Sequence, residues 1–242
     1  MGQYKSSLIL LGAFLAIGLT MSGYFIGQTM YNGKVALNTA EAKGLAERTV
    51  EADEADWRIN FSISWKGDKE LASYYSKAEE NQKTIIDLLK ENGLKESEID
   101  SGLIDYSKRE FRNKEQILVD TKHYLNGSIK VTTKNVKIIK GIRAKVNKLI
   151  TQGIAIDNGT PSYHFTKLND IKPEMLSEAT KNARVAANEF AKNANVEVGG
   201  IRSAVQGTFI VRDQGESYGD SRKIMKNVRI VTTIRFYLTE SI

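Results

Sequence analysis

The chain begins with a long stretch, residues 6–33, that contains no charged side chain. Residues 8–26 of this stretch are almost all apolar, and a helix that rises about 1.5 Å per residue needs about 20 such residues to cross a membrane. We therefore expect a helix embedded in a bilayer, followed by a folded domain in the polar remainder of the chain. The side chains expected to contact lipid are Leu8, Ile9, Leu10, Leu11, Phe14, Leu15, Ile17, Leu19, Tyr24, Phe25 and Ile26.

Two interpretations of this helix are open, a cleaved signal peptide and an uncleaved signal anchor. A signal peptide has a basic start, an apolar run of about 7–15 residues and a small-x-small cleavage site. Here the apolar run is longer, and the small-x-small sequence of Ala40, Glu41 and Ala42 lies well beyond Ile26. The sequence favours an anchor at residues 1–33, a short stalk at 34–43 and an extracytoplasmic domain at 44–242.

Composition excludes several kinds of chemistry. The 242 residues include no cysteine, which rules out disulfides, thiol catalysis, iron–sulfur clusters and cysteine-based zinc sites. The formal net charge of +6 is spread along the chain rather than gathered in a basic stripe, so we expect no nucleic-acid partner.

Apolar spacing predicts an α+β domain with mostly antiparallel sheet and about three packed helices, preceded by the transmembrane helix. Expected strands are residues 48–65 (one bent or two), 101–112, 116–133, 154–168, 205–212 and 223–239. One expected helix starts near Leu71 and ends at Asn92 and Gly93. A second, capped by Asn135 and closed at Gly153, buries Ile139, Ile142, Val146, Leu149 and Ile150. A third has Pro173 in its first turn, buries Leu176, Ala179, Ala183, Ala187 and Phe190, and is ended by Gly199 and Gly200.

Several segments resemble the SIMPL-domain family, in particular its predicted periplasmic, membrane-anchored branch. They are GLAER at 44–48, ADEADW at 52–57, PSYHFTKL at 161–168, KPEML at 172–176, EATKNAR at 178–184, QG at 206–207 and VRIVTT at 228–233. The matching motif residues are expected to be structural, with Gly44 giving backbone freedom, Trp57 buried and Pro173 starting a helix. The full set is Gly44, Glu47, Trp57, Pro161, Phe165, Pro173, Ala179, Ala183, Arg184 and Gly207.

The resemblance implies a bacterial protein held in the inner membrane by a single pass, with its domain in the periplasm. Members of this family have no agreed catalytic residues, some are linked to oxidative-stress defence, and some assemble into large hollow homo-oligomers. The implied partners are the lipid bilayer, further copies of the chain and other envelope proteins. No cofactor is implied.

The residues themselves provide no catalytic motif. His123 and His164 are 41 positions apart, and no metal-ligand spacing surrounds them or the carboxylates Asp53, Glu54 and Asp56. We therefore expect a non-enzymatic, homo-oligomeric structural protein. The alternative is a binding module that acts as a monomer or dimer and holds a small ligand or an envelope protein in a groove. Whether the polar loop at 213–222 is disordered or forms a contact surface is left open.

Overall fold

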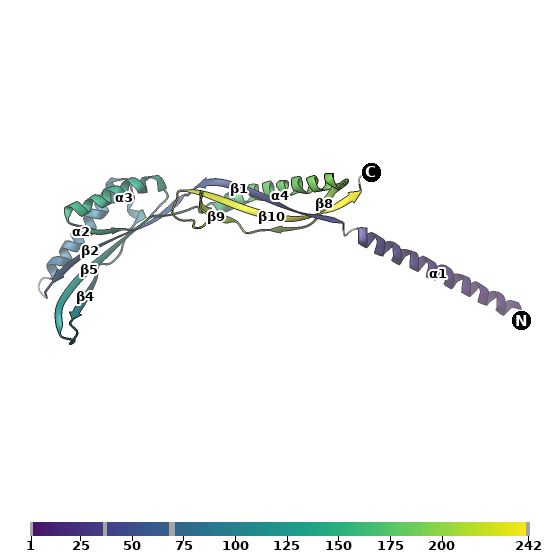
Figure 1. The fold of residues 1–242 in the computed structure, drawn as a ribbon, viewed down its shortest axis with the longest axis horizontal. Coiled ribbons are helices and arrows are strands. Elements are labelled where there is room, and N and C mark those ends of the chain that lie inside the picture. Colours follow the sequence, from purple (N-terminus) through teal and green to yellow (C-terminus); the bar gives the residue numbers. More distant parts are fainter. Residues whose placement is uncertain (1, 36–37, 68–70, 241–242) are drawn as a thin grey trace. The chain divides into compact units, whose positions relative to one another are not determined.

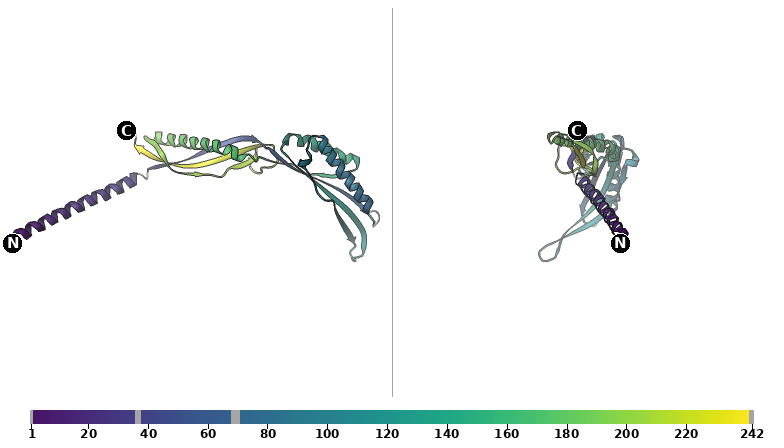
Figure 2. Two further views of the ribbon diagram at one scale, coloured as in Figure 1. Left: turned by 180° about the vertical axis from the view of Figure 1, so that it is seen from behind. Right: turned by 90° about the vertical axis from the view of Figure 1, so that its right-hand side faces the viewer.

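A computed structural model describes residues 2–35, 38–67 and 71–240 of the chain (Figures 1 and 2). The chain forms two compact units, each built from separate stretches of sequence. The first unit comprises Met1–Ala46, Pro173–Phe209 and Ile230–Ile242, and the second comprises Glu47–Lys172 and Ile210–Arg229. Every strand pair with an assigned register is antiparallel, which confirms the predicted α+β class.

Helix α1 (Gly2–Val35) contains the apolar stretch predicted from the sequence. Its segment Ile9–Tyr31 has 23 residues, a mean hydropathy of 2.0 and no buried part, so it is long and apolar enough to cross a membrane. The hydroxyls of Thr20 and Thr29 donate hydrogen bonds to the carbonyl oxygens four residues earlier, at 2.6 and 2.8 Å, which satisfies them within the helix. Of the predicted lipid-facing residues, only Leu8 has a side chain outside the described part.

The first unit is organised by the packing of helix α4 (Leu168–Asn193) on a sheet with the strand order β1-β10-β8. The buried residues of α4 occur at every fourth position and are mainly alanines: Met175, Ala179, Ala183, Ala187 and Ala191. Small side chains let the helix approach the sheet closely. The strands are β1 (Thr39–Glu51), β8 (Val196–Gln206) and β10 (Met225–Glu240). Strand β9 (Ile210–Asp213) pairs with residues Lys226–Arg229 of β10, and both of these segments belong to the second unit.

The second unit contains a six-stranded sheet with the order β3-β5-β2-β6, in which β4 pairs with β5 and β7 pairs with β2. Helices α2 and α3 lie on one face of this sheet (Figure 1). The elements are β2 (Glu54–Lys66), α2 (Leu71–Glu91), β3 (Ile99–Ser101), β4 (Asp105–Arg112), β5 (Leu118–Thr133), α3 (Ile139–Lys148), β6 (Ala155–Asn158) and β7 (Ser162–His164). Short 3-10 turns are η1 (Glu96–Glu98), η2 (Val136–Ile138) and η3 (Leu149–Gln152).

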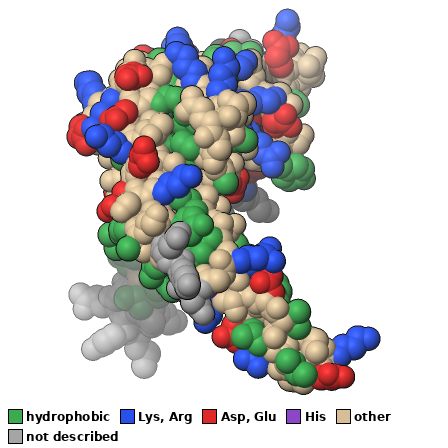
Figure 3. Space-filling view, turned by 90° about the vertical axis from the view of Figure 1, so that its left-hand side faces the viewer, with side chains coloured by type: hydrophobic (Ala, Val, Ile, Leu, Met, Phe, Trp, Pro, Cys, Tyr) green, Lys and Arg blue, Asp and Glu red, His purple; other side chains and the backbone are tan. Residues whose placement is uncertain are grey.

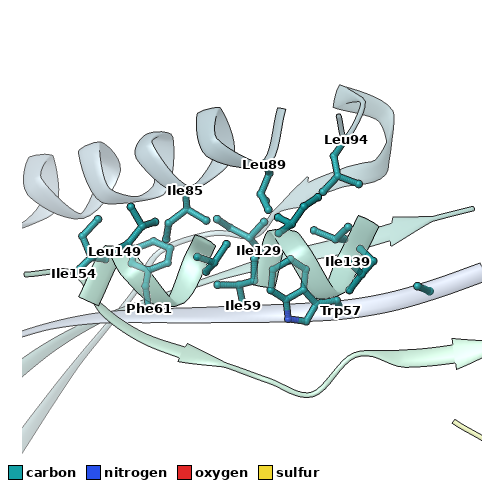
Figure 4. Packing of buried hydrophobic residues seen from close by; sticks show 14 of the residues in the cluster. Trp57, Ile59, Phe61, Ile85, Leu89, Leu94, Ile129, Ile139, Leu149 and Ile154 are labelled. Atoms are coloured by element: carbon teal, nitrogen blue, oxygen red, sulfur yellow. The ribbon is translucent and has the colours of Figure 1, made fainter. Parts of the chain in front are cut away.

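Strand β2 separates the core of the second unit from its open face, because successive side chains point to opposite sides. Trp57, Ile59 and Phe61 are each at most 1% exposed and pack under the helices. Figure 4 shows Ile85 and Leu89 of α2 pointing down toward these residues. The intervening positions of β2 are polar and point to the face opposite to the one on which α2 and α3 lie, within the described part of the second unit.

The hairpin of β4 and β5 leaves apolar side chains exposed. All eight residues of β4 are exposed, and Phe111, Ile117, Leu118 and Val119 are between 45% and 67% exposed. The arm at the lower right of Figure 3 is this hairpin, where hydrophobic side chains lie among basic and acidic ones. Such exposed apolar side chains are typical of contact surfaces.

Several sequence-based expectations need correction around α4. The helix begins at Leu168, so Pro173 is inside it rather than in its first turn. Phe190 is 62% exposed and is not part of the buried stripe of α4. Leu176 is not part of it either, because the buried residues are spaced four apart from Met175 onward. Gly199 and Gly200 do not end the helix; they lie within β8, at a register shift opposite β10 where an extra residue is accommodated.

The other differences concern segment ends. Strand β1 already begins at Thr39, within the range expected to be stalk. Of the two alternatives for residues 48–65, one bent strand or two, the structure has two. The strand expected at 154–168 is two short strands, both paired with β2, and the one expected at 205–212 is split at Gly207. Ile150 is 52% exposed and Asn135 makes no side-chain cap, whereas Gly153 closes η3 with a φ of 87°.

Candidate functional site

A groove of about 620 Å³ lies in the second unit, within the described part of the chain. Its floor is the open face of the sheet, where β5, β2 and β6 each contribute three consecutive residues. The polar side chains that line it are Asn60, Ser62, Asp105, Asn126, Ser128 and Asp157. A volume of this size lies within the range of about 300–1,000 Å³ found for small-molecule sites.

Strand register places these side chains in two rows across the sheet. In one row, Asp105 of β4 pairs with Asn126 of β5, which pairs with Ser62 of β2. In the next row, Ser128 of β5 pairs with Asn60 of β2, which pairs with Asp157 of β6. Each row therefore contains one carboxylate, one amide and one hydroxyl, in opposite order.

The groove offers hydrogen-bonding groups that the protein itself does not use. Within the described part of the chain, none of the six polar side chains makes a side-chain hydrogen bond or ion pair. No basic side chain belongs to the lining, and the nearest basic row, Arg58 and Lys130, lies two residues further along the strands. The lining is thus neutral at its centre and acidic at its two sides.

Two apolar side chains form the rim of the groove. Leu103 precedes β4 at one edge of the sheet and is 87% exposed. Ile150, in η3 at the opposite edge before β6, is 52% exposed. The groove therefore combines a polar floor with apolar contacts at its ends, which is the usual composition of a ligand site.

A second polar cluster holds the loop between β9 and β10. Lys226 and Asp213 are 0% and 2% exposed, and Lys226 Nζ lies 2.5 Å from Asp213 Oδ1. Lys226 Nζ also donates to the carbonyl of Asp220, and the amides of Arg222 and Lys223 donate to the Asp213 carboxylate. These bonds tie the loop at 213–222 to the strands, so this polar loop is ordered.

The pKa of Asp213 reflects two opposing effects. Burial raises the pKa of the carboxyl, but the hydrogen bonds from Lys226 and from the amides of Arg222 and Lys223 hold it below its ordinary value. The carboxylate is therefore ionised in the folded protein at neutral pH. All of its partners belong to the chain itself, so we assign this cluster a structural role.

Neither histidine lies in the groove. The ring of His123 stacks on Trp65, and its Nδ1 is 2.8 Å from the hydroxyl of Tyr106. His164 Nε2 lies 3.8 Å from Asp56, whose other oxygen accepts a hydrogen bond from Thr132. Among the residues the structure describes, no group of three or more histidine, aspartate or glutamate side chains is placed to hold a metal ion.

The motif residues of the first unit lie where chain segments meet. A side chain at Gly44 would place its Cβ 1.8 Å from the carbonyl oxygen of Ala179, so the glycine is needed for close packing, not for a special backbone angle. A Cβ added at Gly207 would likewise lie 2.3 Å from the carbonyl oxygen of Val231. Arg184 donates to the carbonyls of Gly199 and Val198, which joins α4 to β8. Ala179 and Ala183 belong to the buried stripe.

The remaining motif residues belong mainly to the second unit. Trp57 is 1% exposed, and its Nε1 donates to Asn158 Oδ1 and to the Gly159 carbonyl. Glu47 faces Arg229 at 3.4 Å. Pro161 is buried directly before β7, and Phe165 is half-buried just after that strand. Pro173 is exposed on α4, in the first unit. None of these residues lines the groove.

The groove was not predicted from the sequence. The alternation of polar residues along 58–66 and 122–132 does predict a polar sheet face. Which residues of neighbouring strands are opposite each other on that face is set by strand register. Asp105 and Asp157 each belong to a different strand from the central pair. Nothing in the local sequence predicts that they line the same hollow.

Comparison with known proteins identifies the family. Residues 41–229 match the SIMPL family, described as a protein of unknown function (DUF541). The match covers most of the chain, so this protein belongs to the SIMPL family, and the resemblance inferred from its motifs is confirmed. A sequence comparison with curated proteins gave no match.

Proposed function

We propose that this protein is a non-enzymatic SIMPL-domain protein of the bacterial envelope that self-associates into a homo-oligomeric structural assembly. Helix α1 anchors it in the inner membrane by a single pass, and the rest of the chain lies in the periplasm. As the family resemblance implies, the assembly has a role in stress defence, with other envelope proteins as further partners. No cofactor takes part.

The main support for self-association is the exposed edge of β8. This strand pairs with β10 on one side, and no strand covers its other edge within the described part of the chain. All residues at 201–206 are exposed, including Ile201 at 49% and Val205 at 64%. Unpaired edges with apolar side chains favour pairing with another chain. Tethering to one membrane raises the effective concentration of such edges.

Light scattering of the full-length protein in mild detergent tests self-association. We expect a discrete particle of several chains, and we expect Val205→Lys to reduce it to a single chain, because a charge on an edge strand opposes pairing. The matched control is Val185→Lys on α4, where the side chain is 60% exposed but lies on a helix. A single chain for the unmodified protein would rule out self-association. Particles of equal mass for both variants would rule out β8 as the contact.

A second candidate function is a binding module that acts as a monomer or dimer. The groove on the open sheet face favours it, because its polar side chains have no partners within the described chain. The two functions use different surfaces and can be tested separately.

A further inference from the structure

We propose that the groove binds a short, uncharged saccharide of two or three sugar units. This inference gives the second candidate function a ligand class, and it does not depend on self-association. It follows from four properties of the groove: the hydrogen-bonding capacity of its floor, the order of its side chains, its charge and its rim.

The floor matches a ligand that both donates and accepts hydrogen bonds. Asn60 and Asn126 each carry an amide with two donor hydrogens and an acceptor oxygen, and Ser62 and Ser128 each carry a hydroxyl that does both. Sugar hydroxyls have the same dual capacity and can replace the water that otherwise covers these groups. A polyamine could only donate, so the amide hydrogens would lose their hydrogen bonds to water.

The order of the side chains suggests two similar binding positions. Asp105 is the direct cross-strand neighbour of Asn126, and Asp157 is the direct neighbour of Asn60. In each pair the carboxylate accepts and the amide nitrogen donates, which suits two adjacent hydroxyls on one ring. The two pairs are two strand spacings and two residues apart, or about 12 Å between their midpoints. A chain of linked sugars presents such hydroxyl pairs repeatedly.

The charge of the groove lining restricts the class of ligand further. Asp105 and Asp157 have no cationic partner in the described chain, and the lining contains no basic side chain. These two carboxylates would repel an anionic ligand. Repulsion of the wrong ligand is a common source of binding specificity. The apolar rim of Leu103 and Ile150 can contact the C–H faces of sugar rings at either end.

The same geometry indicates binding rather than cleavage of a glycosidic bond. Asp105 and Asp157 are separated by three strand spacings and two residues, so their Cα atoms are roughly 16 Å apart. Glycoside hydrolysis by paired carboxylates needs them about 5–9.5 Å apart across the scissile bond. The site is therefore consistent with the proposed non-enzymatic role.

The test is calorimetric titration of the full-length protein in a detergent without a sugar headgroup, which would otherwise compete. The probes are neutral di- and trisaccharides of glucose, galactose, mannose and N-acetylglucosamine, with digalacturonate as the anionic probe and spermine as the polyamine. We expect at least one neutral saccharide to bind with a Kd below 10 mM, and no binding of digalacturonate.

Matched variants connect binding to the groove. Asn126→Ala and Asp157→Ala change exposed side chains, so folding is preserved, and each should weaken saccharide binding at least tenfold. Ser64→Ala, on the same face of β2 but outside the lining, should leave it unchanged. Equal binding by all three variants would place the saccharide elsewhere and overturn the proposal.

Failure of the ligand class can be separated from failure of the binding function. If spermine or digalacturonate binds in an Asp157- or Asn126-dependent way and no saccharide does, the saccharide proposal is wrong but the groove is still a binding site. If no probe binds, the saccharide proposal is wrong and the second candidate function loses its support.

Discussion

Replacing Gly44 by alanine tests the close packing of α4 on β1. The added Cβ would lie 1.8 Å from the Ala179 oxygen and 2.5 Å from the Ala183 nitrogen. Both are backbone atoms of a helix, so neither can rotate out of the way. Because real Cβ contacts are essentially never closer than 3.0 Å, the helix must move away by about 1.2 Å.

Such a movement would loosen the whole alanine stripe. Ala183 and Ala187 pack with Ala42, Ile234 and Phe236 in one small buried cluster, and a uniform gap weakens every dispersion contact in it. Overpacking of a core typically costs about 1–3 kcal/mol, and an unyielding backbone contact places Gly44→Ala at the upper end, about 2–3 kcal/mol. For a chain of this size, the midpoint of thermal unfolding should fall by about 4–12 °C.

The matched control is Gly200→Ala, because Gly200 lies in β8 of the same unit and a Cβ there meets no atom within 4 Å. Both substitutions restrict the unfolded chain equally, so their difference isolates the packing effect. Thermal unfolding in mild detergent, followed by circular dichroism, gives the two midpoints. Hydrogen exchange should show lost protection in α4 but not in α2. Midpoints within 2 °C of each other would refute the close contact between α4 and β1.

Three further substitutions test other parts of the structure by chemical denaturation. Asp213→Asn leaves Lys226 buried without a counter-charge and should cost about 3–5 kcal/mol at pH 7. Because the folded pKa of Asp213 is lowered, its stabilising effect is present above the ordinary value of about 3.9 and is lost as pH falls through the folded pKa. The difference from the unmodified protein should therefore shrink by pH 3, and a constant difference would contradict the ion pair. Gly141→Ala, at an exposed position of α3 with no atom near the new Cβ, should stabilise by about 0.5–1 kcal/mol; a loss of stability would refute this. Trp57→Phe removes the donor to Asn158 and Gly159 and should cost about 1–3 kcal/mol, and an unchanged midpoint would show that these bonds are not needed.

Local periodicity was sufficient to predict the long elements. The apolar stretch at 8–26 predicted α1, alternation along β2, β5 and β10 predicted strands, and spacing by three and four predicted α2, α3 and α4. These patterns depend only on residues within a few turns of one another, and burial of one face enforces them. The ends of segments were less predictable, as Gly199 shows, because a bulge depends on what the neighbouring strand permits.

The sequence by itself determined that the chain has an apolar N-terminal helix, an α+β domain and the motifs of the SIMPL family. Tertiary structure alone decided that Gly44 must lack a side chain, that Lys226 is buried with Asp213, and that Asn60, Asn126, Asp105 and Asp157 line one groove. The physical reason is that strand pairing and helix packing join residues far apart in the chain. Gly44 meets Ala179 and Asn60 faces Asp157 only after the sheets have formed.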